Sequence, residues 1–583
     1  MFLTSEIFAS LTWQAFERAV TRLLIHEGFD GVRLVGQTND RGADVLGHRH
    51  GKRWVVQVKH WRSRVGPEVI DRTYDALGTY RAQVPVVVAR SGFTGDVRDH
   101  QKVLLSEGVP LQLWDRPALL ERMRQLEEQP LCLRDPERYS ARDYQEEAIR
   151  AIIQTHQERH GRRAMVVMAT GLGKTFVAAE AVRRLHVLRP LRVLAIAHTN
   201  ELVYQLERSF WPFLTASQGT VVWNGLEHPP ESVLATSPFV FACLPTVAAH
   251  IAAGNDLPEF DLLLIDECHH VGAAMYESVL GETRAGTEQG PFLLGLTATP
   301  WRPDETDLEG YFGAPVVSVD LVTGLRRGFL ANVDYRMYTD NIDWEALSGL
   351  EGNSLSPRQI NRTLFISQWD DAVVYELQSA WQEQKSPRAI VFCGTIEHAL
   401  TMRDRINSLG FCAAEAIYSG SSSEGTMKPY ERNKILCDFH DGQVNVVCAV
   451  DIFNEGVDVP DVNIIVFQRV THSRRIFIQQ LGRGLRLAPE KDKVIVLDFV
   501  SDIRRFAAGL ELKDQVDGAA PVRVAGGTRI SLPHTVTFRR VGGEDPQTET
   551  FLREWLEDVA AIEDAGEDVS MLKYPPAMPG SRV

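Results

Sequence analysis

The sequence has no long hydrophobic run, no closely spaced cysteine pair and no low-complexity tract. No apolar stretch among its 583 residues approaches the length that crosses a membrane. Residues 1–6 lack the basic segment of a secretory signal peptide. The seven cysteines are scattered and form no C-x-x-C pair, which argues against disulfides and against a zinc site. We therefore expect a cytoplasmic protein with reduced thiols and no membrane partner.

An excess of positive charge is also absent. The net charge is −15, and 44% hydrophobic and 24% charged residues are typical of an ordinary globular protein. Nucleic-acid binding remains compatible with this charge, because it depends on a local basic surface rather than on the total. Residues 60–64 and 469–486 are the local basic candidates. The chain is long enough for three or four domains, each with its own core.

The N-terminal segment predicts a helix followed by a hairpin. Apolar side chains at intervals of three and four predict an amphipathic helix over residues 13–28. Beyond it the pattern predicts strands over residues 32–35, 43–46 and 53–59. This order places Asp44 on the strand next to that of Gln57 and Lys59. Because Gln57 and Lys59 are two residues apart, both side chains should point to the same face.

These side chains suit metal-dependent hydrolysis of a phosphodiester. The reaction needs a divalent cation held by oxygen ligands, and Asp44 and Gln57 would supply oxygens to Mg²⁺. Lys59 would orient or deprotonate the attacking water and stabilise the transition state. Glu17, on the first helix, would bring a second carboxylate to the same pocket. An isolated D…Q-x-K pattern also arises by chance, so the ordered helix and strands around it are what favour a nuclease.

A longer stretch, about residues 10–125, resembles the Mrr-like branch of the PD-(D/E)xK restriction endonuclease fold. The matching segments are Phe16-Glu17, Gly28-Phe29, Asp40–Asp44, Val56–Trp61, Val86–Thr94 and Val109–Trp114. The resemblance implies an α/β domain that acts on DNA, over residues 1–128. Position 57 holds a neutral glutamine where many relatives hold an acid, although the Mrr-like branch commonly shows this form. Metal binding should be weaker unless Glu17 compensates.

A phosphate-binding loop follows a predicted buried strand at residues 164–168. Its glycines allow backbone N–H groups and the N-terminus of the next helix to face phosphates. Lys174 would reach the β- and γ-phosphates of ATP, and Thr175 would bind Mg²⁺. The other residues expected around the phosphates are Thr170, Gly171 and Gly173.

A second predicted strand, at residues 262–265, ends in an acidic pair. Carboxylates at the carboxyl end of a parallel strand lie where a nucleotide binds. Asp266 would help to hold Mg²⁺, and Glu267 would orient or deprotonate the hydrolytic water. Tyr144-Gln145, further upstream, resembles the adenine-reading element of helicases, since the amide of Gln145 can pair with the adenine edge of ATP. From the sequence alone, Gln145 could equally cap its helix.

The second half of the chain carries further motifs. Residues 479–486 read Q-x-x-G-R-x-x-R and resemble a motif of superfamily 2 helicases. The resemblance implies that Arg483 and Arg486 complete the ATP site across a cleft. For each arginine, a surface ion pair is the simpler alternative. Gly456 and Asp458, in the segment before it, are further candidates for nucleotide binding.

The segment of about residues 138–505 resembles superfamily 2 helicases. The amino-acid sequences of its motifs are most similar to those of the motor subunits of type I and type III restriction enzymes. The resemblance and the alternating strands and helices imply two RecA-like parallel-sheet lobes. We predict an α/β protein. After the N-terminal domain, the expected divisions of the chain are the first lobe at 129–320, an interlobe connection at 321–365, the second lobe at 366–510 and a small C-terminal region of unassigned role at 511–583. ATP and Mg²⁺ are the expected cofactors.

Three functions are compatible with a nuclease-like domain followed by a helicase-like segment in one chain. The first is an ATP-dependent DNA translocase or helicase coupled to a Mg²⁺-dependent endonuclease, in restriction or anti-phage defence. It would act on duplex DNA, modified or branched in some cases, with other defence subunits as partners. The second is a repair or remodelling motor whose nuclease-like domain only grips DNA, and Gln57 favours it. The third is an ATP-switched nucleic-acid sensor. Fold resemblance does not choose among them.

Overall fold

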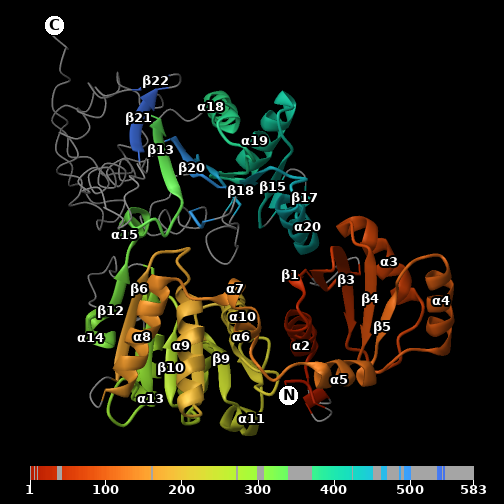
Figure 1. The fold of residues 1–583 in the computed structure, drawn as a ribbon, viewed down its shortest axis with the longest axis vertical. Helices are drawn as coiled ribbons and strands as arrows, with labels where there is room; N and C mark the ends of the chain where they lie inside the picture. The colour runs from red at the N-terminus through yellow and green to blue at the C-terminus, as the bar shows by residue number, and fades with distance from the viewer. Residues whose placement is uncertain are drawn as a thin grey trace.

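The chain folds into three α/β units that Figure 1 shows side by side, in a computed structural model. The structure describes residues 2–4, 7–8, 11–35, 42–158, 162–270, 274–298, 308–338, 370–419, 421–422, 425–450, 461–468, 485–487, 491–499, 535–540 and 543–544. Within these ranges no helix has the length and apolar character that a membrane span requires. The units contain sheets of five, seven and eight strands, and the third also carries a two-stranded hairpin.

The N-terminal domain has a mixed sheet in the order β1-β2-β3-β4-β5. Its strands are β1 (Asp30–Leu34), β2 (Val45–Arg49), β3 (Lys52–Lys59), β4 (Val84–Ala89) and β5 (Gln112–Trp114). The first three are antiparallel, and β3, β4 and β5 run parallel. The predicted hairpin is confirmed, with boundaries within a few residues of those expected.

Among the elements that the structure describes, four helices cover this sheet. They are α2 (Trp13–His26), α3 (Glu68–Tyr80), α4 (Gly95–Ser106) and α5 (Arg116–Gln125). The Thr12 hydroxyl caps α2 by accepting from the Ala15 N–H, and Gly28, at φ +83°, follows its end. Apolar side chains of α2 and α5 pack on one face of the sheet, whereas those of α3 and α4 pack on the other.

The first motor lobe has a seven-stranded parallel sheet in the order β12-β6-β11-β10-β7-β9-β8. Its strands are β6 (Arg163–Met168), β7 (Val193–Ala197), β8 (Thr220–Trp223), β9 (Phe239–Cys243), β10 (Leu262–Ile265), β11 (Phe292–Thr297) and β12 (Pro315–Val319). The central strands are buried on both faces, as their continuous apolar sequences predict.

Helices flank this sheet on both sides. They are α8 (Asp143–Gln157), α9 (Lys174–Leu188), α10 (Asn200–Phe210), η1 (Trp211–Phe213), α11 (Glu231–Thr236), α12 (Leu244–Ala252), η2 (Cys268–His270), α13 (Ala274–Thr283), α14 (Leu308–Phe312) and α15 (Leu321–Arg326). The expected linker between the N-terminal domain and this lobe holds two short helices, α6 (Leu131–Arg134) and α7 (Pro136–Tyr139).

The second lobe has an eight-stranded sheet in the order β15-β18-β14-β19-β20-β13-β21-β22, antiparallel only at the last pair. Its strands are β13 (Asn332–Tyr338), β14 (Ala389–Phe392), β15 (Ala414–Ile417), β18 (Val446–Ala449), β19 (Ile464–Phe467), β20 (Lys493–Phe499), β21 (Thr535–Arg540) and β22 (Gly543–Glu544), with the hairpin β16 (Ser421–Ser422) and β17 (Gly425–Thr426). Its helices are α18 (Asp370–Gln382), α19 (Ile396–Leu409) and α20 (Pro429–His440).

This sheet differs from the predicted division of the chain in two places. β13 lies inside the segment 321–365 that we expected to connect the lobes, and β21 lies inside the C-terminal region 511–583. Both belong to the second sheet, because β13 pairs in parallel with β20 on one side and with β21 on the other. Sequence pattern alone does not reveal this, since the paired strands are more than 150 residues apart along the chain.

Candidate active sites

Asp44 comes directly before β2 and faces β3. Val45 pairs with Val56 across the ladder, and the Asp44 N–H donates to the Val56 carbonyl at 3.0 Å. The residue is 3% exposed, and its carboxylate Oδ2 accepts a hydrogen bond from the Val58 N–H at 2.6 Å. These bonds hold the carboxylate beside the end of β3, where the strand reaches Lys59.

Gln57 is buried on the face that α3 covers. Thr73 of α3 donates its only hydroxyl proton to the Val69 carbonyl at 2.8 Å, so toward Gln57 it acts as an acceptor. The amide orientation that satisfies every neighbour has Gln57 Nε2 donating to Thr73 Oγ1 at 2.7 Å and Oε1 accepting from Lys59 Nζ at 3.0 Å. The reverse orientation puts Oε1 beside Thr73 and the amide nitrogen against the ammonium, a donor against a donor, so we adopt the first.

Asp44, Gln57 and Lys59 therefore meet at one end of two adjacent strands, as predicted. Their donor set, a carboxylate and an amide oxygen, fits Mg²⁺, which prefers oxygen ligands and retains several waters. Across the part of the chain that the structure describes, no group of three His, Cys, Asp or Glu side chains is arranged to hold a metal.

Glu17 comes from a different element than these three residues. It lies on α2, which packs on the face of the sheet opposite to α3. The preceding Phe16 contacts the ring of His60 at 5.9 Å between centroids, and His60 directly follows Lys59. Glu17 is thus near the edge of the sheet where the site lies, and its role as a second carboxylate stays a prediction.

His60 was one of the basic candidates near this site. Burial, and then the charge of Arg90, lower its pKa below the usual 6.5, and Arg90 Nη1 lies 2.8 Å from His60 Nε2. The imidazole is therefore neutral at neutral pH and adds no positive charge to the surface. Trp61, Arg62 and Arg64, which follow it, are exposed.

Two residues of this site were not predicted from the sequence. Thr73, on α3, orients the Gln57 amide, and no short-range sequence pattern indicates that these two residues are in contact. Gly42 has φ +92°, and a Cβ at this position would lie 2.3 Å from the Arg72 carbonyl oxygen on α3. Only glycine accepts this close approach, which brings the segment before Asp44 against α3.

The phosphate-binding loop joins β6 to α9 in the first motor lobe. Gly171 and Gly173 have φ +92° and +87°, a region that glycine adopts without strain. Lys174 begins α9, and its Nζ donates to Glu267 Oε1 at 2.7 Å. Thr170 and Thr175 lie in the same loop and at the start of α9. The loop and the acidic pair after β10 are thus brought together as predicted.

Asp266 and Glu267 occupy the turn after β10. Burial, and then the negative charge of Glu267, raise the pKa of Asp266 to about 6, although the ammonium of Lys174 acts in the opposite direction. His269 Nδ1 lies 3.0 Å from Thr297 Oγ1 and 3.3 Å from Glu267 Oε2. This contact links the acidic pair to the end of β11.

Gln145 uses its amide within the protein. Its Oε1 accepts from the Arg142 N–H at 2.9 Å, which caps α8, and its Nε2 donates to the Leu172 carbonyl of the phosphate-binding loop at 2.8 Å. A Cβ on Gly173 would lie 2.5 Å from the same Nε2. The capping alternative is thus realised here, and the reading of adenine stays a prediction.

Of the four second-lobe candidates, the structure describes only Arg486. Gly456, Asp458 and Arg483 lie outside the described residues. Leu485, immediately before Arg486, is buried, and its carbonyl accepts from the Ala331 N–H at 2.8 Å just before β13. Arg486 is thus at the junction of the two lobes, and its contact with ATP stays a prediction.

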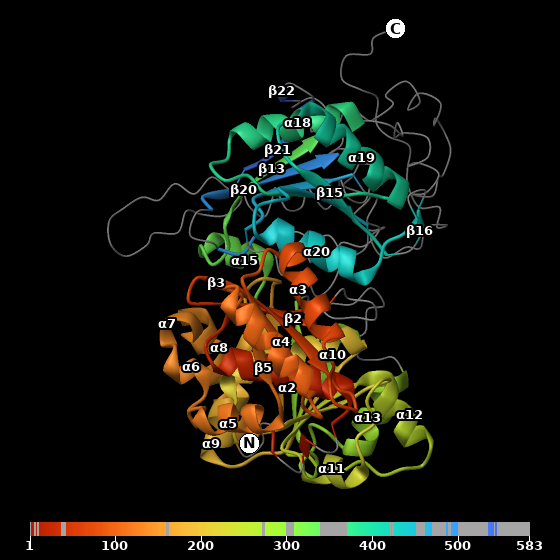
Figure 2. The ribbon, with the colours of Figure 1, turned by 90° about the vertical axis from the view of Figure 1, so that its right-hand side faces the viewer.

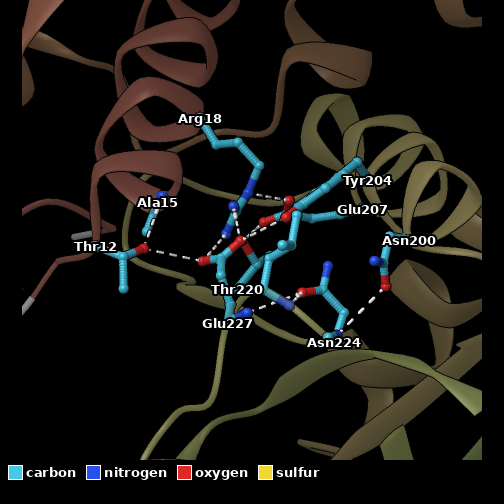
Figure 3. A network of polar contacts seen from close by, with 11 residues as sticks. Thr12, Ala15, Arg18, Asn200, Tyr204, Glu207, Thr220, Asn224 and Glu227 are labelled. Atoms are coloured by element: carbon cyan, nitrogen blue, oxygen red, sulfur yellow. Dashed lines mark hydrogen bonds and ion pairs between the residues drawn. The ribbon is translucent and has the colours of Figure 1, made fainter. Parts of the chain in front are cut away.

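The N-terminal domain is attached to the first lobe through buried charges that the sequence did not indicate. In Figure 3, Arg18 extends from α2 between Glu207 and Glu227 of the first lobe. Arg18 Nε lies 2.8 Å from Glu207 Oε2, and its Nη1 pairs with Glu227 Oε1. Burial lowers the pKa of Arg18, but the two carboxylates outweigh this effect and raise it, so the guanidinium stays charged. Thr220 and Tyr204 donate further hydrogen bonds to the same carboxylates.

A second arginine of α2 extends this contact. Arg22 is 2% exposed and donates through Nη2 to the carbonyls of Thr215 and Gln218, at 3.0 and 2.9 Å. Burial lowers its pKa to about 9, with Glu207 acting in the opposite direction. The N-terminal segment follows the same path, because the Phe2 N–H donates to the Ala216 carbonyl at 2.8 Å. The two domains thus form one packed unit.

We expect Arg18→Ala to weaken this attachment strongly. It leaves Glu207 and Glu227 buried without a counter-charge, which costs about 3–5 kcal/mol in comparable buried pairs. Thermal unfolding and limited proteolysis between the domains would measure the loss. Arg150→Ala is the matched control, because its pair with Glu146 is 75% exposed on the arginine side and should contribute less than about 1 kcal/mol. An unchanged unfolding midpoint and cleavage pattern for Arg18→Ala would contradict the assignment.

Family comparisons agree with this arrangement. Residues 8–123 match a restriction endonuclease family, the Mrr catalytic domain. Residues 138–302 match the res subunit of type III restriction enzymes, and residues 370–488 match the helicase conserved C-terminal domain. The chain thus combines a restriction endonuclease domain with the two domains of a helicase, as predicted.

Three relatives illustrate the similarity. The endonuclease subunit of the type I restriction enzyme EcoAI of Escherichia coli is 28% identical over 76% of this chain and 53% of its own length. A mitochondrial irc3 helicase of Schizosaccharomyces pombe is 27% identical over 66% of this chain and 61% of its own. The DNA 3'-5' translocase XPB2 of Sulfurisphaera tokodaii is 27% identical over 61% of this chain and 80% of its own. The chain therefore spans less than two thirds of the first two.

Proposed function

We propose that the chain is an ATP-dependent DNA translocase coupled to a Mg²⁺-dependent DNA endonuclease, acting in restriction or anti-phage defence. The proposal is supported by a restriction endonuclease domain next to both helicase domains, and by the relatedness to a type I endonuclease subunit. Its substrate would be duplex DNA, with modified or branched DNA as special cases. Other defence subunits would be its partners, in the cytoplasm.

One observation carries the proposal: the nuclease domain is fixed to the motor rather than tethered to it. Arg18 and Arg22 are both less than 10% exposed and reach into the first lobe. In a domain that moves freely on a flexible linker, such arginines would stay exposed to water, because burying a charge without a partner has a large desolvation free energy. A rigid attachment means that the nuclease site follows the first lobe wherever the motor moves along DNA.

In the nuclease, Asp44 and Gln57 would hold the cation, which supplies an activated water and charge neutralisation at the phosphate. Lys59, held by the Gln57 carbonyl, would keep its ammonium next to the scissile phosphate and orient the water. Glu17 would add negative charge from α2. The neutral Gln57 would thus connect two parts of the site, because its amide nitrogen donates to Thr73 and its amide oxygen accepts from Lys59.

In the motor, each residue has a role set by its element. Lys174 would leave Glu267 for the β- and γ-phosphates, which frees Glu267 to orient water. Thr175 and Asp266 would hold Mg²⁺. Lobe closure would bring in the arginines of the second lobe, Arg483 and Arg486, and the closure would be the step that moves DNA.

Cleavage of plasmid DNA tests the proposal directly. We expect nicking or cutting of unmodified or methylated plasmid that needs Mg²⁺, increases with ATP and stops when EDTA is added. The dependence on ATP is expected because the nuclease is attached to the motor. ATP hydrolysis stimulated by DNA, with no cutting of either plasmid at any Mg²⁺ or Mn²⁺ concentration, would contradict it.

Gln57 favours one second candidate, a repair or remodelling motor whose N-terminal domain only grips DNA. A neutral amide contributes less to cation binding than a carboxylate does. In that case the protein would bind DNA through the same domain and move along it without breaking it. Strand-displacement or protein-displacement assays on uncut DNA would identify this activity.

A further inference from the structure

The second motor lobe also contacts the nuclease domain, through helix α20. Figures 1 and 2 both place α20 next to α3. Cys437 of α20 is buried in a cluster with Val35, Ala43, Leu46, Val55, Ala76 and Tyr80 of the nuclease domain. Beside this cluster, Arg53 of β3 pairs with Asp441 at 2.5 Å. The nuclease domain therefore bridges the two lobes.

A short chain of hydrogen bonds leads from α20 to Asp44. Asn433 Nδ2 donates to the Val35 carbonyl at 2.9 Å. The N–H of Val35 donates to the Asp44 carbonyl at 2.9 Å, and the Asp44 carboxylate accepts from Val58. Ala43, the neighbour of Asp44, is itself fully buried in the cluster around Cys437. The backbone around the candidate metal ligand is thus packed against a helix of the motor.

The two attachments of the nuclease domain differ in kind. The attachment to the first lobe uses Arg18 with two buried carboxylates. The attachment to α20 uses the hydrogen bond from Asn433, the ion pair of Arg53 and Asp441, whose side chains are 13% and 18% exposed, and a small apolar cluster around Cys437, whose thiol also lies near Arg33. Movement of one lobe against the other, which the proposed motor function requires, would strain one of these two attachments. The attachment at α20 would be the one to separate, because its ion pair is more exposed than the pairs that Arg18 makes.

We propose that Asn433 is a positioning residue of the nuclease site, and that Asp44 is ordered for the cation only while α20 is docked. The inference rests on the proposed nuclease function. It deepens that function, because it makes a residue of the second motor lobe responsible for the readiness of the nuclease. Cutting would then depend on which lobe arrangement the nucleotide favours.

Metal binding by the full-length chain tests the inference without relying on cleavage. Mn²⁺ is titrated calorimetrically into protein free of nucleotide and DNA, and Asp44→Ala defines the part of the signal that belongs to this site. Asn433→Ala is expected to weaken that binding about 2- to 10-fold, the effect of one lost hydrogen bond. It should raise the Mg²⁺ concentration for half-maximal cleavage by the same factor, with DNA-stimulated ATP hydrolysis within about twofold of the parent.

Three variants on α20 make the test specific. Asn433→Asp has the same size but cannot donate when ionised, so it should weaken Mn²⁺ binding at least as much. Asn433→Gln retains the donor and should recover part of the affinity. Lys434→Ala changes a 43% exposed neighbour that pairs with Asp438 along the helix, and should have no effect.

Two results would overturn the inference and can be told apart. If the parent binds Mn²⁺ and cuts DNA, and both Asn433→Ala and Asn433→Asp do so equally well, the positioning role is wrong and the nuclease function stands. If the parent shows no Mn²⁺ binding that depends on Asp44 and no cutting, the proposed nuclease function is wrong, and the inference with it.

Discussion

Lys59→Ala is expected to abolish DNA cutting while ATP hydrolysis continues. Lys59 Nζ lies 3.0 Å from Gln57 Oε1, so its ammonium is held in one position beside the candidate metal ligands. A charge held in place in this way stabilises the transition state most, and removal of a comparable group costs about 10²–10³ in rate. Because Gln57 is neutral, little other charge in the site compensates, and we expect a loss at the upper end of this range or beyond.

Plasmid cutting and ATP hydrolysis measured in the same reactions would check this. Lys52→Ala is the matched control, because Lys52 begins the same strand at its exposed end and should leave cutting unchanged. Lys59→Ala should hydrolyse ATP at the parent rate, since the motor lobes do not contain it. If Lys59→Ala cuts as fast as the parent, the nuclease site has been assigned to the wrong residues.

Lys174→Ala is expected to abolish ATP hydrolysis and leave the nuclease domain folded. Lys174 pairs with Glu267 in the structure, and its ammonium acts to lower the pKa of Asp266. Without it, burial and the charge of Glu267 would raise that pKa further above its present value of about 6. Protonated Asp266 binds Mg²⁺ poorly, so the substitution removes a phosphate contact and weakens a metal ligand at once.

DNA-stimulated ATP hydrolysis should fall at least 10²-fold in Lys174→Ala, by analogy with other losses of phosphate-binding charge. Mn²⁺ binding that depends on Asp44 would show that the nuclease domain is intact. Lys102→Ala, at a 76% exposed lysine paired with Asp99 on α4, is the control. Hydrolysis by Lys174→Ala at more than about a tenth of the parent rate would contradict the assignment of the loop.

The grouping of residues at both candidate active sites could be predicted because each depends on short stretches of chain. Asp44, Gln57 and Lys59 lie within one hairpin, where strand alternation determines which side chains share a face. The phosphate-binding loop and the acidic pair each follow a buried apolar strand directly. Glu17 was proposed from its place on the first helix, and Gln145 and the second-lobe residues from resemblance; their roles in chemistry are still to be tested.

The attachments around these sites could not be predicted in the same way. Arg18 meets Glu207 and Glu227 across about two hundred residues of chain, and no spacing or composition relates them. Asn433 approaches Val35 across an even longer separation. Thr73 and Gly42 are unremarkable in sequence, and they matter only because α3 lies against the hairpin.

By itself, then, the sequence determined the fold of each domain and the residues of each candidate active site, because periodicity, turns and loop chemistry act over a few residues. Only the tertiary structure decided how the domains pack on one another and that β13 and β21 complete the second sheet. It also decided that the oxygen of the Gln57 amide, rather than its nitrogen, faces Lys59. The physical reason is that these contacts join surfaces made of distant segments. Their energies come from buried charges and packed apolar side chains, which acquire partners only once the chain has folded.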